Sequence, residues 1–267
     1  MRLSETEQQA LNDLVEKLKS DPLSNPILLA DLTQLRSSCD IFVSLGKHGR
    51  LRGVLAVTHH LPLTTIAFSD MPAGTFIDLM TNALDLPQSE SGSFYCLASH
   101  SQRELIKSVS YVKWEVPEFR YELGPEASHA NFESQLAEGL EVRELSTGDV
   151  AAISALYSEV PLVAFSPKVL TLGPWVGVFS GESLVGVAGV HFSTPWVTEL
   201  GHAVTHTNYR RMGCARALLA QQISLLTNKT QHITACCLQE NYGPQALLES
   251  IGFKRLEQVW LMEFGVG

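Results

Sequence analysis

The chain has 267 residues, of which 45% are hydrophobic and 18% are charged, and its formal net charge at pH 7 is −9. This composition is typical of a globular protein with one large domain or two small ones. No apolar run approaches the roughly 20 residues that a membrane helix needs, and no basic stripe is visible, so neither a membrane nor a nucleic acid is expected as a partner.

The five cysteines indicate a reducing compartment. Their number is odd and no C-x-x-C pair is present, which excludes a disulfide framework and a zinc site. Cys236 and Cys237 are adjacent and are expected on opposite faces of a strand. The polar N-terminus lacks the features of a signal peptide. We therefore expect a cytoplasmic protein without a metal, either a monomer or a homodimer.

The first half of the chain predicts a helix followed by alternating strands and helices. Residues 4–19 predict a helix, because Ser4 and Glu7 form a capping-box pair and leucines recur on one face. Strands are predicted at 40–45, 51–59, 64–70, 93–99 and 114–123, and helices at 75–85 and 101–109. Residues 124–139 are rich in Gly, Ser, Ala and Glu without periodicity, which predicts a linker.

The second half begins a similar cycle with a strand at 140–145 and a helix capped by S-T-G-D at 146–149. Further strands are predicted at 175–179, 184–192, 198–206, 232–239 and 253–264, and helices at about 214–226 and 244–250.

A short pattern is shared by the two halves. Residues 51–57 and 184–190 both read L-x-G-V-x-x-V, and Thr65 and Thr198 follow at the same distance. One interpretation is that strand hairpins resemble one another because Gly, Val and Leu are common. The matching order of elements favours the other interpretation, a degenerate internal duplication.

The stretch N-Y-R-R-M-G-C-A at 208–215 lies between a predicted strand and a predicted helix. One interpretation is a basic turn before an amphipathic helix. The other is a phosphate cradle, because a helix N-terminus presents unpaired N–H groups and a partial positive charge. Gly213 and the two small residues after it would let a ligand approach the backbone, and Arg210 and Arg211 would add charge.

The same residues resemble those of a known family. R-R-M-G-C-A at 210–215 resembles the R/Q-x-x-G-x-G/A loop of the GNAT superfamily of acyl-CoA N-acyltransferases. T-H-T-N-Y-R-R resembles the T-H-P-E-Y-R approach of one branch, with Thr207 where Pro is usual. Residues 241–253 resemble the N-x-x-A-x-x-L-Y-x-x-x-G-F element. The nearest likeness is to the glycine N-acyltransferase-like, tandem GNAT group.

This resemblance implies an α+β (mixed α/β) fold with two tandem GNAT-like domains, each a mixed, mostly antiparallel sheet flanked by helices. It also implies an acyl-CoA site. The residues that match the family's contacts to the pantetheine arm and the pyrophosphate are Ala203, Val204, Thr205, Arg210, Arg211, Met212, Gly213, Cys214 and Ala215. Asn241 matches an asparagine that lies along the cofactor, although a helix cap would explain it equally well.

Glu199 lies eleven positions before Arg210, the spacing of the general-base glutamate in family members that use one. Such a carboxylate takes the proton of the attacking amine, directly or through water. The alternative is a surface glutamate on a strand edge. His202 is three residues on and is expected to face the opposite side of the strand. We interpret His202 and His206 as packed or solvated histidines rather than ligands.

Two departures from the family limit the resemblance. Leu248 occupies the place of a tyrosine that often protonates the departing thiolate. In the first half, Ile66 occupies the place of Glu199, and residues 77–82 occupy the place of the phosphate loop without a glycine or an arginine. We therefore predict a degenerate, non-catalytic GNAT-like domain at 1–123, a linker at 124–139 and a catalytic domain at 140–267.

The function implied by the resemblance is an N-acetyltransferase that moves an acetyl group from acetyl-CoA to a primary amine of a small molecule or peptide. Coenzyme A would lie between the strands at 198–206 and 232–239, and the acceptor would enter near 158–174. The alternative is a protein that binds acyl-CoA without turnover, as a sensor or scaffold.

Overall fold

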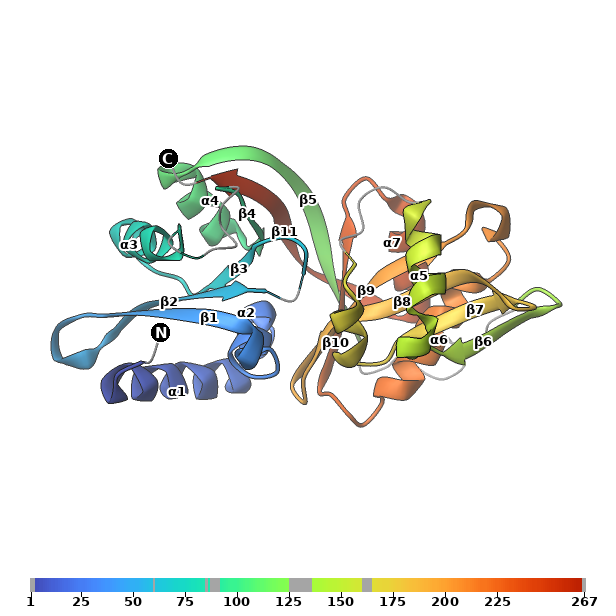
Figure 1. The fold of residues 1–267 in the computed structure, drawn as a ribbon, viewed down its shortest axis with the longest axis horizontal. Helices are drawn as coiled ribbons and strands as arrows, with labels where there is room; N and C mark the ends of the chain where they lie inside the picture. Colours follow the sequence, from blue (N-terminus) through green and yellow to red (C-terminus); the bar gives the residue numbers. More distant parts are fainter. Residues whose placement is uncertain are drawn as a thin grey trace. The chain divides into compact units, whose positions relative to one another are not determined.

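The chain folds into two compact units in a computed structural model (Figure 1). The first unit comprises Met1–Glu118 and Gln258–Gly267, and the second comprises Phe119–Glu257. Residues 3–59, 61–84, 86, 92–124, 136–159 and 165–265 are described. No helix within these ranges is both long and apolar enough to cross a membrane.

The first unit contains two helices on each face of a sheet. Its elements are α1 (Glu5–Ser20), α2 (Pro26–Leu32), β1 (Cys39–Leu45), β2 (Leu51–Thr58), β3 (Thr65–Phe68), α3 (Ala73–Leu84), β4 (Phe94–Ala98), α4 (His100–Val109), β5 (Tyr111–Leu123) and β11 (Phe253–Gly265). The strand order is β1-β2-β3-β4-β11-β5. Strand β2 is buried on both faces, and its Leu55 and Val57 pack in the core that includes α3 and α4.

Helix α2 is an element that the sequence analysis missed. It has seven residues, and six of them are buried, so it shows no alternation between apolar and polar faces. Its start carries two ordinary signals, because Pro26 occupies the first turn and the Asn25 side chain accepts a hydrogen bond from the Leu28 N–H.

Asp31 in α2 is buried, and its carboxylate accepts a hydrogen bond from the Thr58 hydroxyl at 3.0 Å. Burial raises the pKa of Asp31 to about 7. The unfolded chain releases this proton near pH ~3.9, so this group lowers the stability of the fold progressively as the pH rises from about 4 to 7.

Asp31→Asn is therefore expected to increase the free energy of unfolding at pH 8 by on the order of a few kcal/mol, with a smaller effect at pH 4. Urea unfolding at both pH values measures this difference. Asp78→Asn, an exposed position on α3, is the matched control. Equal effects of Asp31→Asn at the two pH values would contradict the account.

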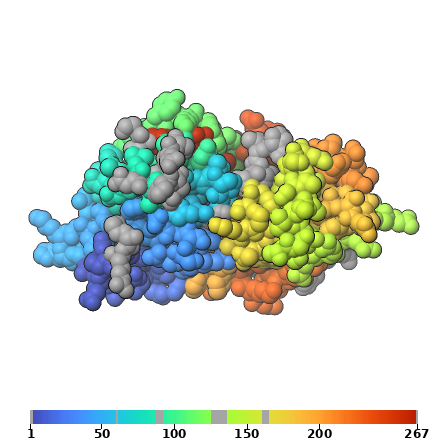
Figure 2. All heavy atoms as spheres, viewed as in Figure 1, coloured from blue at the N-terminus to red at the C-terminus, as the bar shows by residue number. Residues whose placement is uncertain are grey.

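The second unit is a sheet with helices on both faces, and it carries the candidate site. Its elements are β6 (Leu140–Glu144), α5 (Val150–Ser158), β7 (Val176–Ser180), β8 (Ser183–Ser193), β9 (Val197–Thr205), α6 (Cys214–Leu226), β10 (His232–Leu238) and α7 (Tyr242–Ile251). The strand order is β11-β5-β10-β9-β8-β7-β6. Helix α5 lies over one face of this sheet, with α6 and α7 over the other (Figure 1). The yellow-green atoms of the α5 region form part of the surface that Figure 2 shows.

The order of elements repeats between the units, as the shared L-x-G-V-x-x-V pattern predicted. That pattern lies in β2 and in β8, and each unit then places a strand, a helix and a parallel strand. The shift of 133 positions (198 − 65) that relates Thr65 to Thr198 does not hold beyond the strands. Residues 77–82 lie inside α3, so the junction that corresponds to the phosphate loop is 69–72, which also lacks a glycine and an arginine.

The second unit begins and ends at other residues than the predicted second domain, 140–267. Gln258–Gly267 belongs to the first unit, because β11 pairs with β4 from Trp260 to Phe264. Residues 119–123 of β5 belong to the second unit. Most of the predicted linker, 125–135, lies outside the described residues, as do residues 160–164 of the predicted acceptor region.

Tyr121 shows why the second unit needs β5. Its side chain is 0% exposed and packs in the core formed by β9, β10, α6 and α7. We expect Tyr121→Ala to cost about 3–5 kcal/mol of unfolding free energy, the usual range for removing a buried aromatic ring.

Tyr111→Ala, at a 71% exposed position of the same strand, is the control and is expected to change stability by less than about 0.5 kcal/mol. Urea unfolding of both variants is the measurement. Equal effects would show that Tyr121 does not belong to the core. A chain beginning at residue 140 lacks β5 altogether and is not expected to form this unit.

Candidate acyl-CoA site

Strands β9 and β10 are paired over only part of their length. The parallel pairing runs from Val197 with His232 to Leu200 with Ala235. Beyond this stretch β9 continues to Thr205 and β10 to Leu238, and neither segment, both fully described, pairs with the other. The backbone of β9 from Gly201 onward is therefore free of β10, as the predicted place for coenzyme A requires.

The loop after β9 ends in a glycine with a left-handed backbone. Gly213 has φ 83° and is the N-cap of α6, and no side-chain hydrogen bond caps this helix. The first turn of α6 contains no acidic residue. A 13-residue helix whose N-terminus has these properties suits a phosphate group, because backbone N–H groups and the helix dipole face the ligand.

The predicted cofactor residues other than Asn241 follow one another from the end of β9 to the start of α6, and we call this segment, residues 203–215, the rim. Ala203, Arg210, Arg211, Met212 and Ala215 are exposed, Val204, Thr205 and Gly213 are half-buried, and Cys214 is buried. Arg211 also has a left-handed backbone, with φ 65°. Burial raises the pKa of the Cys214 thiol, whose sulfur donates to the Tyr209 carbonyl at 3.4 Å, so this cysteine is a structural group.

The start of helix α7 distinguishes between the two interpretations of Asn241, a cofactor contact and a helix cap. Asn241 is the N-cap residue of α7 but its side chain makes no capping hydrogen bond, which leaves its exposed amide available to a ligand. Leu248, at the place of the family's tyrosine, is 5% exposed and packs in the core with α6. Leu248 is therefore a core residue and carries no group that could donate a proton.

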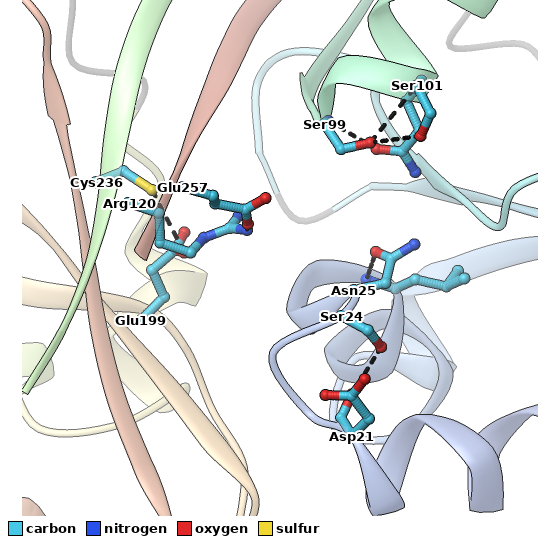
Figure 3. A network of polar contacts seen from close by, with 11 residues as sticks. Asp21, Ser24, Asn25, Ser99, Ser101, Arg120, Glu199, Cys236 and Glu257 are labelled. Atoms are coloured by element: carbon cyan, nitrogen blue, oxygen red, sulfur yellow. Dashed lines mark hydrogen bonds and ion pairs between the residues drawn. The ribbon is translucent and has the colours of Figure 1, made fainter. Parts of the chain in front are cut away.

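Glu199 is not the exposed strand-edge residue of the alternative interpretation. Strand β9 lies between β8 and β10, and the Glu199 side chain is buried. The Arg120 Nε donates to Glu199 Oε2 at 3.2 Å, and the Cys236 thiol donates to the same oxygen at 3.6 Å (Figure 3). Glu199 Oε1 has no hydrogen-bond partner among the described residues.

Arg120 is a site residue that the sequence analysis missed. It lies on β5, is 4% exposed and contacts both Glu199 and Glu257, the latter at 2.5 Å. The two carboxylates keep it charged, since they raise its pKa. The sequence does not single out this arginine, because β5 also carries Lys113, Glu115, Glu118 and Glu122, and it gives no indication that this strand would join the second unit.

Two backbone irregularities lie beside Glu199 in the β8–β9 ladder. One falls between Val190 and Phe192, at His191, and the other falls opposite His202, which has φ 54°. His202 was expected to face away from Glu199. The irregularity turns it, so that its ring lies 4.6 Å from the ring of His191 and 5.0 Å from that of Trp175, on the same face as Glu199.

His206 and helix α5 also contact the end of β9. The Tyr157 hydroxyl donates to the His202 carbonyl at 2.5 Å, and His206 Nε2 lies 3.2 Å from Glu159. His206 Nδ1 accepts the Asn208 N–H and begins the short turn before Arg210. These contacts agree with the predicted packed roles of the two histidines.

A comparison with protein families finds one match. Residues 175–261 match the family described as FR47-like protein. This segment holds β9, the loop, α6, β10 and α7, and therefore all of the predicted cofactor residues. No curated protein matches the chain.

Solved structures share the fold along nearly the whole chain. A putative GNAT-family acetyltransferase from Novosphingobium aromaticivorans is 16% identical, with a TM-score of 0.66 and coverage of 92% of this chain and 99% of that one. A GCN5-related N-acetyltransferase-like protein from Streptococcus suis is 14% identical, with a TM-score of 0.67 and coverage of 96% and 99%.

A tandem GNAT protein from the clavulanic acid biosynthesis pathway is 12% identical, with a TM-score of 0.65 and coverage of 99% of this chain and 97% of that one. At these identities the likeness shows the fold, and it confirms the predicted fold class. The FR47-like match covers the segment that carries the cradle, and the chain as a whole shares the fold of these GNAT-family structures.

Proposed function

We propose that the second unit is an acyl-CoA-dependent N-acyltransferase, most simply an N-acetyltransferase that acts on a primary amine of a small molecule or peptide. The observation that carries this proposal is the combination of a divergent β9–β10 pair with the glycine-capped N-terminus of α6. The rim between them offers backbone groups to the pantetheine arm and a positive helix end to the diphosphate.

The residues proposed to hold acetyl-CoA are those of the rim. Ala203, Val204 and Thr205 would meet the pantetheine arm, and Arg210 to Ala215 would meet the diphosphate. Asn241 would lie along the cofactor from the other side of the opening. Small or flexible side chains at 212–215 leave the backbone accessible, and no acidic residue of the first turn repels the phosphates.

In the proposed reaction the amine nitrogen attacks the thioester carbonyl, the carbon–sulfur bond breaks, and coenzyme A leaves as the thiol. Glu199 drives loss of the amine proton. Because Glu199 is only 2% exposed, it acts on the amine through an intervening group rather than by direct contact. Arg120 and Cys236 hold its Oε2 in place.

Thiol release from acetyl-CoA, measured over a panel of small amines, amino acids and peptides, tests the proposal. Transfer is expected for at least one amine, with the acetylated product identified by mass spectrometry. Tight binding of acetyl-CoA without release of thiol by any amine would instead favour the alternative, a sensor or scaffold, for which Leu248 at the place of the tyrosine is the supporting observation. The first unit is proposed to be non-catalytic, because its 69–72 junction lacks the glycine and arginines.

A further inference from the structure

Each irregularity of the β8–β9 ladder brings a histidine to one face of the sheet. His191 lies at the shift between Val190 and Phe192, and two residues of β8 therefore stand beside Glu199 where a regular ladder has one. Irregularities of this kind redirect side chains next to functional sites. Here they gather two imidazoles beside a buried carboxylate.

The ring of His191 lies directly over Gly201. A Cβ atom built at Gly201 would come within 3 Å of three ring atoms of His191, so the ring occupies the space that any side chain at 201 would need. Gly201 is also the first residue of β9 beyond the stretch paired with β10. The His191 imidazole therefore marks the point where the two strands separate.

His191 and Glu199 differ in their access to solvent. His191 is exposed, whereas Glu199 is buried and held by Arg120. An acceptor amine that approaches the opening between the strands from this face meets the imidazole before the carboxylate. His191 is therefore placed to be the group through which buried Glu199 acts on the amine.

Resting on the proposed function, we propose that His191 is the group that takes the proton from the acceptor amine, with Glu199 stabilising the imidazolium that forms. The amine lone pair makes the new nitrogen–carbon bond, and the carbon–sulfur pair leaves with sulfur. The imidazolium then returns its proton to the thiolate through water, so no other reactant is required. This return also supplies the acid that Leu248 cannot provide.

The charges around His191 suit this role. Desolvation by the surrounding protein lowers the pKa of His191, and the negative charge of Glu199 opposes that shift. The imidazole is therefore neutral near pH 7 and able to accept a proton. The titratable and charged groups on the neighbouring elements are Glu199 and His202 on β9, Tyr157 on α5, Arg120 on β5 and Cys236 on β10.

A titration of the histidine ring signals by NMR tests the coupling without any turnover. His191→Asn assigns the signal. In Glu199→Gln, which lacks the carboxylate charge, the pKa of His191 is expected to fall below its value in the wild type. An unchanged pKa would overturn the coupling between the two groups.

Single-turnover rates against pH test the proton transfer itself. His191→Asn is expected to lower the rate by about 10²–10⁴-fold and to remove the fall in rate that protonation of the imidazole causes at low pH, with acetyl-CoA affinity unchanged. His48→Asn, at an exposed position of the first unit where φ is 58° and asparagine is tolerated, should leave rate and profile unchanged.

A His191→Asn variant with the wild-type rate and pH profile would overturn the proposal. The two failures are distinguishable. If the proposed function is wrong, the wild type itself transfers no acyl group, whereas if only the role of His191 is wrong, transfer proceeds normally in the variant.

Discussion

Gly213→Glu is expected to abolish coenzyme A binding. Gly213 adopts φ 83°, a left-handed conformation that strains any L side chain, and it is the residue from which α6 begins. A side chain there would occupy the space that the diphosphate needs, and a carboxylate would repel it. The predicted outcome in titration calorimetry is no detectable heat of binding.

Gly74→Glu is the matched control. Gly74 lies near the start of α3, the helix that corresponds to α6 in the first unit, and it has open space around it. The control carries the same added charge and should bind coenzyme A normally. Normal binding by a folded Gly213→Glu variant would mean that the loop does not hold the diphosphate.

Glu199→Gln is expected to reduce single-turnover acyl transfer by at least about 100-fold at neutral pH, because glutamine keeps the shape of the side chain but cannot carry the charge or take the proton. Acetyl-CoA affinity should change little, since the rim residues are untouched. Raising the pH should restore part of the rate, because more of the amine is then already deprotonated. Single-turnover measurements avoid masking by product release.

Glu199→Gln also removes one of the two carboxylates that contact buried Arg120, so thermal unfolding must show that the variant is folded. Glu257→Gln is the matched control, because it removes the other carboxylate that contacts Arg120 and leaves Glu199 in place. Its rate should stay within a few-fold of the wild type. Equal losses in the two variants would assign the effect to Arg120 rather than to Glu199.

Local signals in the sequence were sufficient for most elements of the fold. The Ser4–Glu7 capping box predicted α1, and both contacts of that box are present. Strand alternation predicted opposite faces for Cys236 and Cys237, and the structure packs Cys237 in the core and places Cys236 against Glu199. The narrower likeness to the glycine N-acyltransferase-like group stays a prediction.

What the sequence could not predict depends on long-range pairing. Membership of β5 in the second unit, and with it the Arg120–Glu199 pair, follows from a strand that lies before the predicted linker. The predicted orientation of His202 was wrong for a related reason. A strict two-residue period places it opposite Glu199, whereas the shifted register with β8 turns it to the same face.

Titration calorimetry of coenzyme A against the full chain tests the central claim most directly, because the cradle is proposed at the β9–α6 junction alone. The account predicts one site per chain. Two sites would show that the first unit also binds coenzyme A, and no binding at all would contradict the proposed function itself.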